Sequence, residues 1–228
     1  MSVEVDSRLH LVHDALSLNE SEETWDRIAT GIRTLQTLLE DDRGVASEHL
    51  FNTLRSFATP LLRSMISERS RLSGAALDLL STAARELGAT FDSQLSLFLP
   101  TLLTLCGRPN KVFANRSKAC LINVIESTQS PQILSILHRS AKDKSISLRL
   151  AVAEATLACL HSFNPPDLQK DLRGQEIEAM IRSFATDANA DIRKVGRKIF
   201  EAYAILLPNR VDKCVYGHHV YTFCVLTI

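Results

Sequence analysis

The stretch DIRKVGRKIFEAYAIL, residues 191–206, places apolar side chains three and four positions apart along one stripe. This spacing is typical of an amphipathic helix. The stretch opens with an apolar anchor, Ile192, a small residue four positions later, Gly196, and another apolar residue at Phe200. The same opening, with a medium residue allowed at the second or third position, occurs at Leu72–Ala76–Leu80, Phe113–Ser117–Leu121 and Leu148–Val152–Thr156.

These openings recur with a regular period. A weaker copy begins at Ile28, and successive anchors lie 35 to 44 residues apart. A period of roughly 40–47 residues built from helix pairs is the signature of HEAT and armadillo repeats. The sequence therefore predicts an all-α, right-handed solenoid of about five HEAT-like helix pairs, which offers a long binding surface and by default no catalytic pocket. The expected pairs are 5–17 with 25–40, 46–66 with 70–87, 92–106 with 111–127, 131–141 with 145–163, and 173–186 with 190–207.

Two prolines fall within expected first helices. Pro60 and Pro100 precede the anchors of the second and third repeats by similar distances. Recurrence at one repeat position favours a shared kink that curves the stack. The alternative is that each proline begins a new helix, where its missing N–H costs nothing.

The composition fits a helical protein with a sizeable core. Of 228 residues, 45% are hydrophobic, and there are only 8 Gly and 7 Pro. The formal net charge is zero, so bulk electrostatics favour neither a nucleic acid nor an anionic membrane as a partner. No apolar run approaches ~18 residues and no signal stretch follows Met1, so we expect a cytosolic or nuclear location.

The cysteines and histidines predict no metal site. No CxxC pair occurs, and three cysteines lie in apolar helical patterns as small core residues: Cys106, Cys120 and Cys159. The spacing of Cys214, His218, His219 and Cys224 fits no zinc finger or ribbon. No phosphate-binding or nucleophile-elbow motif appears, so we expect no cofactor and no enzymatic activity.

The chain changes character at Val211. The segment VDKCVYGHHVYTFCVLTI, residues 211–228, is aromatic and β-branched and lacks helical spacing. We therefore predict one repeat domain at residues 1–210 and an irregular tail at residues 211–228.

The segments that open the second helices form an ordered series. They read TWDR at 24–27, ERSRL at 68–72, PNKVFA at 109–114, KSISLR at 144–149 and DANADIR at 187–193. Over about residues 20–210 this series resembles the TOG domain of the CLASP family of microtubule-associated proteins. Gly74 departs from the pattern, because many members carry a basic residue there. The helices of a sixth repeat after residue 210 are absent or replaced by the tail.

The resemblance implies a flat, paddle-shaped domain. It implies that this domain binds αβ-tubulin and microtubules along the one edge that is formed by the loops between paired helices. It implies a non-catalytic, monomeric part of a microtubule plus-end and spindle regulator that promotes rescue and suppresses catastrophe. The implied location is the cytoplasm, microtubules and spindle, with the nucleus and kinetochore as further sites. The implied tubulin-binding residues are Trp25, Arg69, Ser70, Arg71, Lys111, Lys142, Lys144 and Asn189.

Several of these residues have two interpretations. Trp25 is the only tryptophan, and it either anchors an interface or packs into the core beside Ile28 and Ala29. The loop lysines and arginines either form a basic row about 30 Å long, given a repeat spacing of ~8–10 Å, or are ordinary solubilising charges. Arg149 and Arg193 follow their anchors directly, so we expect structural bonds to a carboxylate or carbonyl of the adjacent repeat.

A second class of function is a general HEAT or armadillo scaffold. Such a scaffold binds a peptide or a regulatory subunit on its concave face, which requires polar side chains along the second helices. The second-helix faces here are mostly apolar and small. The sequence therefore favours binding through the loop edge.

Overall fold

The computed structural model describes residues 3–41 and 47–215, and within these ranges the regular structure is helical, without strands. The described chain divides into two compact units. Unit 1 contains the residues up to Leu105 together with Asn110–Thr128, and unit 2 contains Cys106–Pro109 and the residues from Gln129. In each unit, helices pair in an antiparallel manner, as the helical-repeat pattern predicts.

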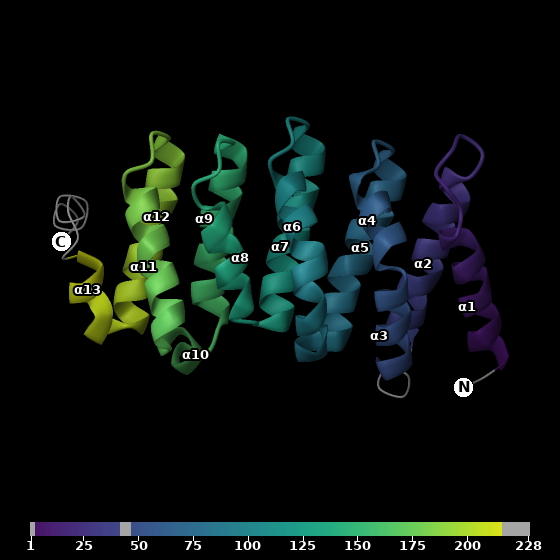
Figure 1. Cartoon of the computed structure of the whole chain (residues 1–228), viewed down its shortest axis with the longest axis horizontal. Helices are drawn as coiled ribbons and strands as arrows, with labels where there is room; N and C mark the ends of the chain where they lie inside the picture. Colours follow the sequence, from purple (N-terminus) through teal and green to yellow (C-terminus); the bar gives the residue numbers. More distant parts are fainter. Residues whose placement is uncertain (1–2, 42–46, 216–228) are drawn as a thin grey trace. The chain divides into compact units, whose positions relative to one another are not determined.

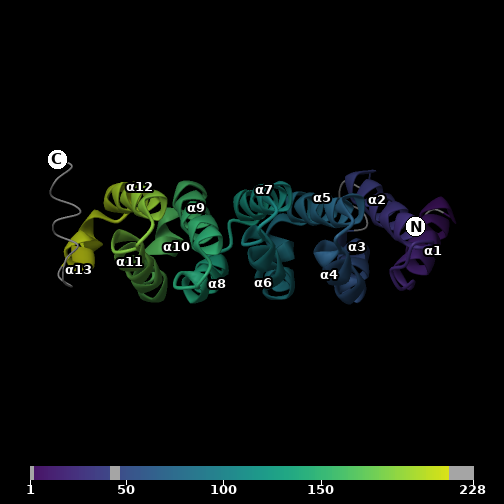
Figure 2. The ribbon, with the colours of Figure 1, turned by 90° about the horizontal axis from the view of Figure 1, so that it is seen from above.

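Unit 1 consists of two layers of helices. Its elements are α1 (Val3–Leu16), α2 (Trp25–Asp41), α3 (Ser47–Ser56), α4 (Ala58–Ile66), α5 (Ser70–Leu87), the 3₁₀ helix η1 (Gly88–Gln94), α6 (Leu95–Cys106) and α7 (Lys111–Thr128). Helices α2, α5 and α7 form one layer, in which α5 packs against both neighbours. Helices α1, α4 and α6 lie in the other layer (Figure 2).

Unit 2 has the same layered arrangement. Its elements are α8 (Gln132–Ser140), α9 (Ile146–Ser162), α10 (Pro165–Gln169), α11 (Asp171–Ala185), α12 (Ala190–Leu206), η2 (Pro208–Arg210) and α13 (Val211–Val215). Helices α9 and α12 pack side by side in one layer, and α8 and α11 pack in the other (Figures 1 and 2).

The repeated sequence pattern corresponds to buried positions. The anchors Ile28, Leu72, Phe113 and Ile192 are buried, whereas Leu148 is half-buried. The small residue four positions later lets the second helix approach the first. A Cβ at Gly196 would lie 2.9 Å from Cβ of Phe184 on α11, so α12 packs closely against α11.

The prolines do not share one structural role. The first helix of the second pair is interrupted at Phe57, and Pro60 is the third residue of α4. Pro60 therefore begins a new helix, in the first turn where its missing N–H has no partner to lose. Pro100 lies inside α6. The prediction of a shared kink is wrong for Pro60, because the helix is interrupted at Phe57, before the proline.

The helical structure continues past the predicted boundary at residue 210. Residues 211–215 form α13, which packs against α11, and the side chain of Cys214 is buried. The prediction of an irregular tail is therefore wrong for these residues, because Cys214 gives the segment an apolar contact. The rest of the predicted tail, residues 216–228, lies outside the described residues. The division into one domain and a tail stays a prediction.

Within residues 3–41 and 47–215, no helix combines the length and the apolar composition needed to cross a lipid bilayer.

Candidate functional site

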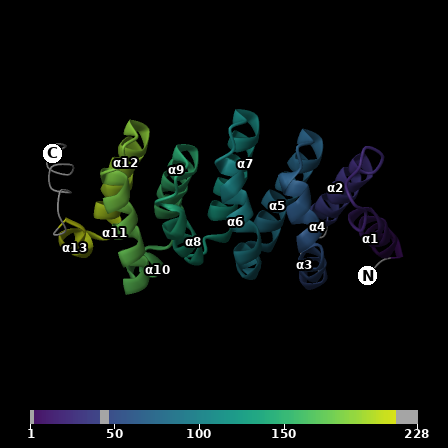
Figure 3. The same ribbon diagram turned by 45° about the horizontal axis from the view of Figure 1, so that its top comes forward.

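The loop end of unit 1 consists of residues 17–25, 67–71 and 110–112, where α2, α5 and α7 begin (Figure 3). Hydrogen bonds close the α1–α2 loop into a turn. The hydroxyl of Thr24 donates to the carbonyl of Asn19 at 2.6 Å and accepts the N–H of Ser21 at 2.8 Å. This turn leads directly into Trp25, the first residue of α2.

Trp25 and Arg71 lie together at this loop end. Trp25 is half-buried, and Cζ of Arg71 lies 5.4 Å from the centroid of its ring. The same guanidinium forms an ion pair with Asp26 at 3.4 Å, and both of those side chains are exposed. A cation over an indole ring is attracted to its electron-rich face. The first residues of α2 and α5 therefore present a joined aromatic and basic surface.

Arg69 connects two loops within unit 1. Its guanidinium forms ion pairs with Glu20 at 2.7 Å and with Glu22 at 2.6 Å. The hydroxyl of Ser67 also donates to Glu20, at 2.8 Å. Because its charge is balanced by two carboxylates, Arg69 fixes the α1–α2 loop against the α4–α5 loop and thereby positions Arg71.

The start of α7 carries exposed side chains of two kinds. Lys111 is exposed at the first position, and Val112 is 74% exposed at the second. The side chain of Asn110 accepts the N–H of Val112 at 3.0 Å, which caps the helix. Ser70 is likewise exposed at the first position of α5.

The loop end of unit 2 consists of residues 141–146 and 186–190. Its central contact is between Arg149 and Asp187, whose side chains are 15% and 6% exposed. The guanidinium donates to both carboxylate oxygens, at 2.7 and 3.1 Å. These hydrogen bonds lower the pKa of Asp187. The expected structural role of Arg149 is confirmed.

Arg193 and Asn189 also hold this loop end in shape. Arg193 donates to the carbonyls of Asp187 and Ala188 at 2.7 and 2.8 Å. These carbonyls belong to its own loop, not to an adjacent repeat as we expected. The side chain of Asn189 accepts the N–H groups of Asp191 and Ile192, so it caps α12.

Lys142 and Lys144 are exposed in the α8–α9 loop. Ile146 follows them as the first residue of α9 and is 52% exposed. Unit 2 therefore presents basic and apolar side chains in one short segment, as unit 1 does at Lys111 and Val112. The continuous basic row that we expected across all repeats stays a prediction.

Sequence reasoning missed the exposed aliphatic residues Val112 and Ile146. Each stands at a helix start beside a lysine or in a lysine-bearing loop. Their signal was present, because an apolar residue one or two positions before the anchor of its repeat projects away from the core face of the helix.

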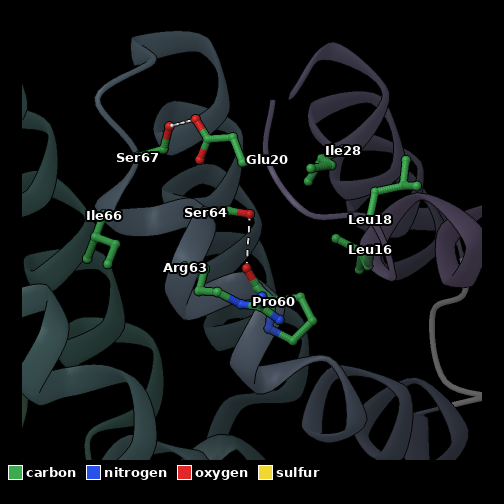
Figure 4. Close-up of a pocket in the computed structure, with 9 residues that line it drawn as sticks. All are labelled: Leu16, Leu18, Glu20, Ile28, Pro60, Arg63, Ser64, Ile66 and Ser67. Atoms are coloured by element: carbon green, nitrogen blue, oxygen red, sulfur yellow. Dashed lines mark hydrogen bonds between the residues drawn. The ribbon is translucent and has the colours of Figure 1, made fainter. Parts of the chain in front are cut away.

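A cavity of about 310 Å³ lies beside the loop end of unit 1, between the α1–α2 loop and α4 (Figure 4). Leu16, Leu18 and Ile28 form part of its apolar lining. Of its polar groups, the hydroxyl of Ser64 donates to the carbonyl of Pro60 at 3.0 Å. The guanidinium of Arg63 donates to Asn19 at 3.3 Å. These bonds fix the local structure.

The described part of the chain contains no group of His, Cys, Asp or Glu side chains that could hold a metal ion. Cys106, Cys120 and Cys159 are buried, as expected for core residues. Burial raises the pKa of the Cys120 thiol to about 12, so this thiol stays protonated at neutral pH.

In each unit the helices pair in two layers, and this arrangement is that of a helical-repeat domain. The chain is similar to a solved structure titled "Crescerin uses a TOG domain array to regulate microtubules in the primary cilium". The TM-score is 0.68 at 15% sequence identity, and the match covers 97% of this chain and 92% of the other. The described structure is therefore an all-α helical-repeat fold of the TOG type.

The chain belongs to the CLASP N-terminal family, whose profile matches residues 5–218. It is 26% identical to Protein stu1 of Aspergillus fumigatus over 201 residues, which is 85% of this chain and 15% of that protein. It is 22% identical to CLIP-associating protein 1-B of Xenopus laevis, over 87% of this chain and 13% of that protein. The chain thus spans about a seventh of the length of these relatives. The resemblance found in the loop motifs is confirmed.

Proposed function

We propose that this chain is a non-catalytic module that binds αβ-tubulin and microtubules through the loop ends of its helix pairs. Membership of the CLASP N-terminal family and the TOG-type fold support this function. The observation that carries it is the pair formed by Trp25 and Arg71, an aromatic ring and a guanidinium at the start of adjacent helices. Trp and Arg are both enriched among the side chains that contribute most of the binding energy at interfaces.

The proposed contact residues are those that the sequence implied, and they have different roles. Trp25, Arg71 and Lys111 in unit 1, and Lys142 and Lys144 in unit 2, would contact acidic tubulin directly. Arg69 and Asn189 would hold the loops in shape, since their side chains are bonded within the chain. Ser70 would lie at the contact as a small exposed residue.

The proposal extends to the biological setting of the module. In a longer protein it would promote rescue and suppress catastrophe of microtubules, on the spindle and at the kinetochore as well as in the cytoplasm. We propose that it acts as a monomer, with neither nucleic acid nor membrane as a partner. The zero net charge of the chain agrees with this choice.

Two binding experiments test the function. The chain is passed over a size-exclusion column with free αβ-tubulin, and in parallel it is sedimented with stabilised microtubules. We expect co-elution, co-sedimentation or both, weakening as the salt concentration rises. Failure to bind in both assays at low salt would overturn the proposed function.

A further inference from the structure

Arg116 of α7 extends across the surface of α5. Its guanidinium lies over Gly74, where a Cβ would be only 2.5 Å from Cζ of Arg116. Nη2 of the same group donates to the carboxylate of Asp78 at 2.6 Å. Gly74 and Asp78 are four residues apart and so lie on one face of α5. Gly74 lies one turn after Ser70, and Asp78 lies two turns after it. The absence of a side chain at position 74 makes room for the guanidinium.

This placement brings Arg116 next to the loop end of unit 1. Along α7, Arg116 lies one turn after the exposed Val112, on the same face. Along α5, the guanidinium lies one turn beyond Ser70 and close to the start that also carries Arg71. The side chain of Arg116 remains 44% exposed, so its charged group faces solvent as well as α5.

The chemistry of the group suits an external carboxylate. A guanidinium has five N–H donors in a planar fork, and Arg116 uses Nη2 for its bond to Asp78. The remaining edge is suited to a bidentate contact with a second carboxylate. Asp78 restricts the orientation of the group, so less side-chain freedom is lost when a partner binds.

We infer that Arg116 is a further tubulin-contacting residue, which places its guanidinium across the α5–α7 interface over position 74 of α5. This inference rests on the proposed function. Gly74 contributes by leaving space, and Asp78 contributes as a positioning residue. The recognised chemistry is a carboxylate on the acidic surface of tubulin.

Tubulin affinity and melting temperature measured on four variants test the inference. Arg116→Ala should weaken binding about tenfold, the effect of a substantial interface contact. Gly74→Ala keeps every charge but displaces the guanidinium, so it should weaken binding by a smaller factor. The double variant Gly74→Lys with Arg116→Ala places a cation on α5 where the Arg116 guanidinium lies in the wild type, and it should recover most of the affinity. Arg85→Ala is the matched control, because Arg85 forms exposed ion pairs at the other end of α5 and should not affect binding.

The outcomes separate this inference from the proposed function. Wild-type chain that fails to bind tubulin overturns the proposed function itself. Wild-type chain that binds, together with a stably folded Arg116→Ala variant of unchanged affinity, overturns the role of Arg116 alone. Loss of binding in Arg116→Ala without recovery in the double variant would also overturn it, because the charge over α5 would not be what tubulin recognises.

Discussion

At the scale of single residues, the contact between Arg149 and Asp187 links stability to pH. The carboxylate of Asp187 is nearly buried and accepts two hydrogen bonds from Arg149, which lower its pKa. The unfolded chain has a pKa of about 3.9 at this position. The contact therefore stabilises the native state at pH values above about 4, and this stabilisation is lost as the pH falls through the lower native pKa.

We predict that Asp187→Asn destabilises unit 2 at pH 7 by about 3 kcal/mol, because it leaves a nearly buried guanidinium without its carboxylate. The difference in unfolding free energy between this variant and the wild type should shrink as the pH is lowered below about 4. Urea unfolding at pH 7 and at low pH measures both quantities. Asp191→Asn is the matched control, since Asp191 is exposed on the next helix. A difference that does not depend on pH would contradict the assigned role.

At the scale of helices, the end of unit 2 depends on a polar network around Glu178. Its carboxylate is 6% exposed and accepts hydrogen bonds from Tyr203 at 2.7 Å and from Arg210 at 3.0 Å. Arg210 also forms an ion pair with Asp171 at 2.8 Å, and this contact raises the pKa of the Arg210 guanidinium. Helix α13 packs against α11 immediately after this network. Within the described residues, unit 2 therefore ends with η2 and α13, beyond α12.

Shortened chains test where the fold of unit 2 ends. A chain that stops after Val215 should keep its helical circular dichroism and its melting temperature, because it retains Arg210 and α13. A chain that stops after Asn209 should lose about 3–5 kcal/mol, since Glu178 is left buried without its cation. Arg210→Met in the full chain separates the loss of the ion pairs from the loss of α13. A large drop in melting temperature for the chain ending at Val215 would show that residues 216–228 belong to the fold.

The helix pairs were predictable because their signal is local. The 3.6-residue periodicity and the recurring anchors gave each second helix to within one or two residues, from α2 to α12. The break at Phe57 and the short helix α13 were not predictable, because they depend on contacts with other helices. The same limit applies to the site. Sequence motifs identified Trp25 and Arg71 separately, but their contact and the placement of Arg116 over Gly74 require the packing of α2, α5 and α7.

At the scale of the whole molecule, the zero net charge makes any salt dependence informative. A neutral chain has little overall attraction to acidic tubulin, so steep salt dependence must come from local groups such as the exposed Lys111 and Lys144. We predict that reversing both charges, Lys111→Glu with Lys144→Glu, weakens binding mainly through slower association and leaves the melting temperature unchanged. Stopped-flow association rates at several salt concentrations measure this effect.

The control for the double variant of Lys111 and Lys144 changes the net charge by the same amount, but at positions away from the loop ends. Arg33→Glu with Lys198→Glu alters one exposed cation in each unit, in both cases away from the helix starts. This control should bind tubulin nearly as the wild type does. Equal weakening in both pairs would mean that tubulin senses the overall charge of the chain. Binding that is insensitive to salt and to both pairs would remove the electrostatic part of the account.

The measurement that tests the central claim most directly is the tubulin affinity of Trp25→Ala together with its melting temperature. If Trp25 anchors the contact, the binding free energy should weaken by about 2 kcal/mol, which is roughly a thirty-fold loss of affinity. Stability should fall by no more than about 1 kcal/mol, from the lost contact with Arg71. A loss of about 3–5 kcal/mol in folding stability would instead make Trp25 a core residue. That result, or a stable variant that binds tubulin normally, would contradict the claim that Trp25 contacts tubulin.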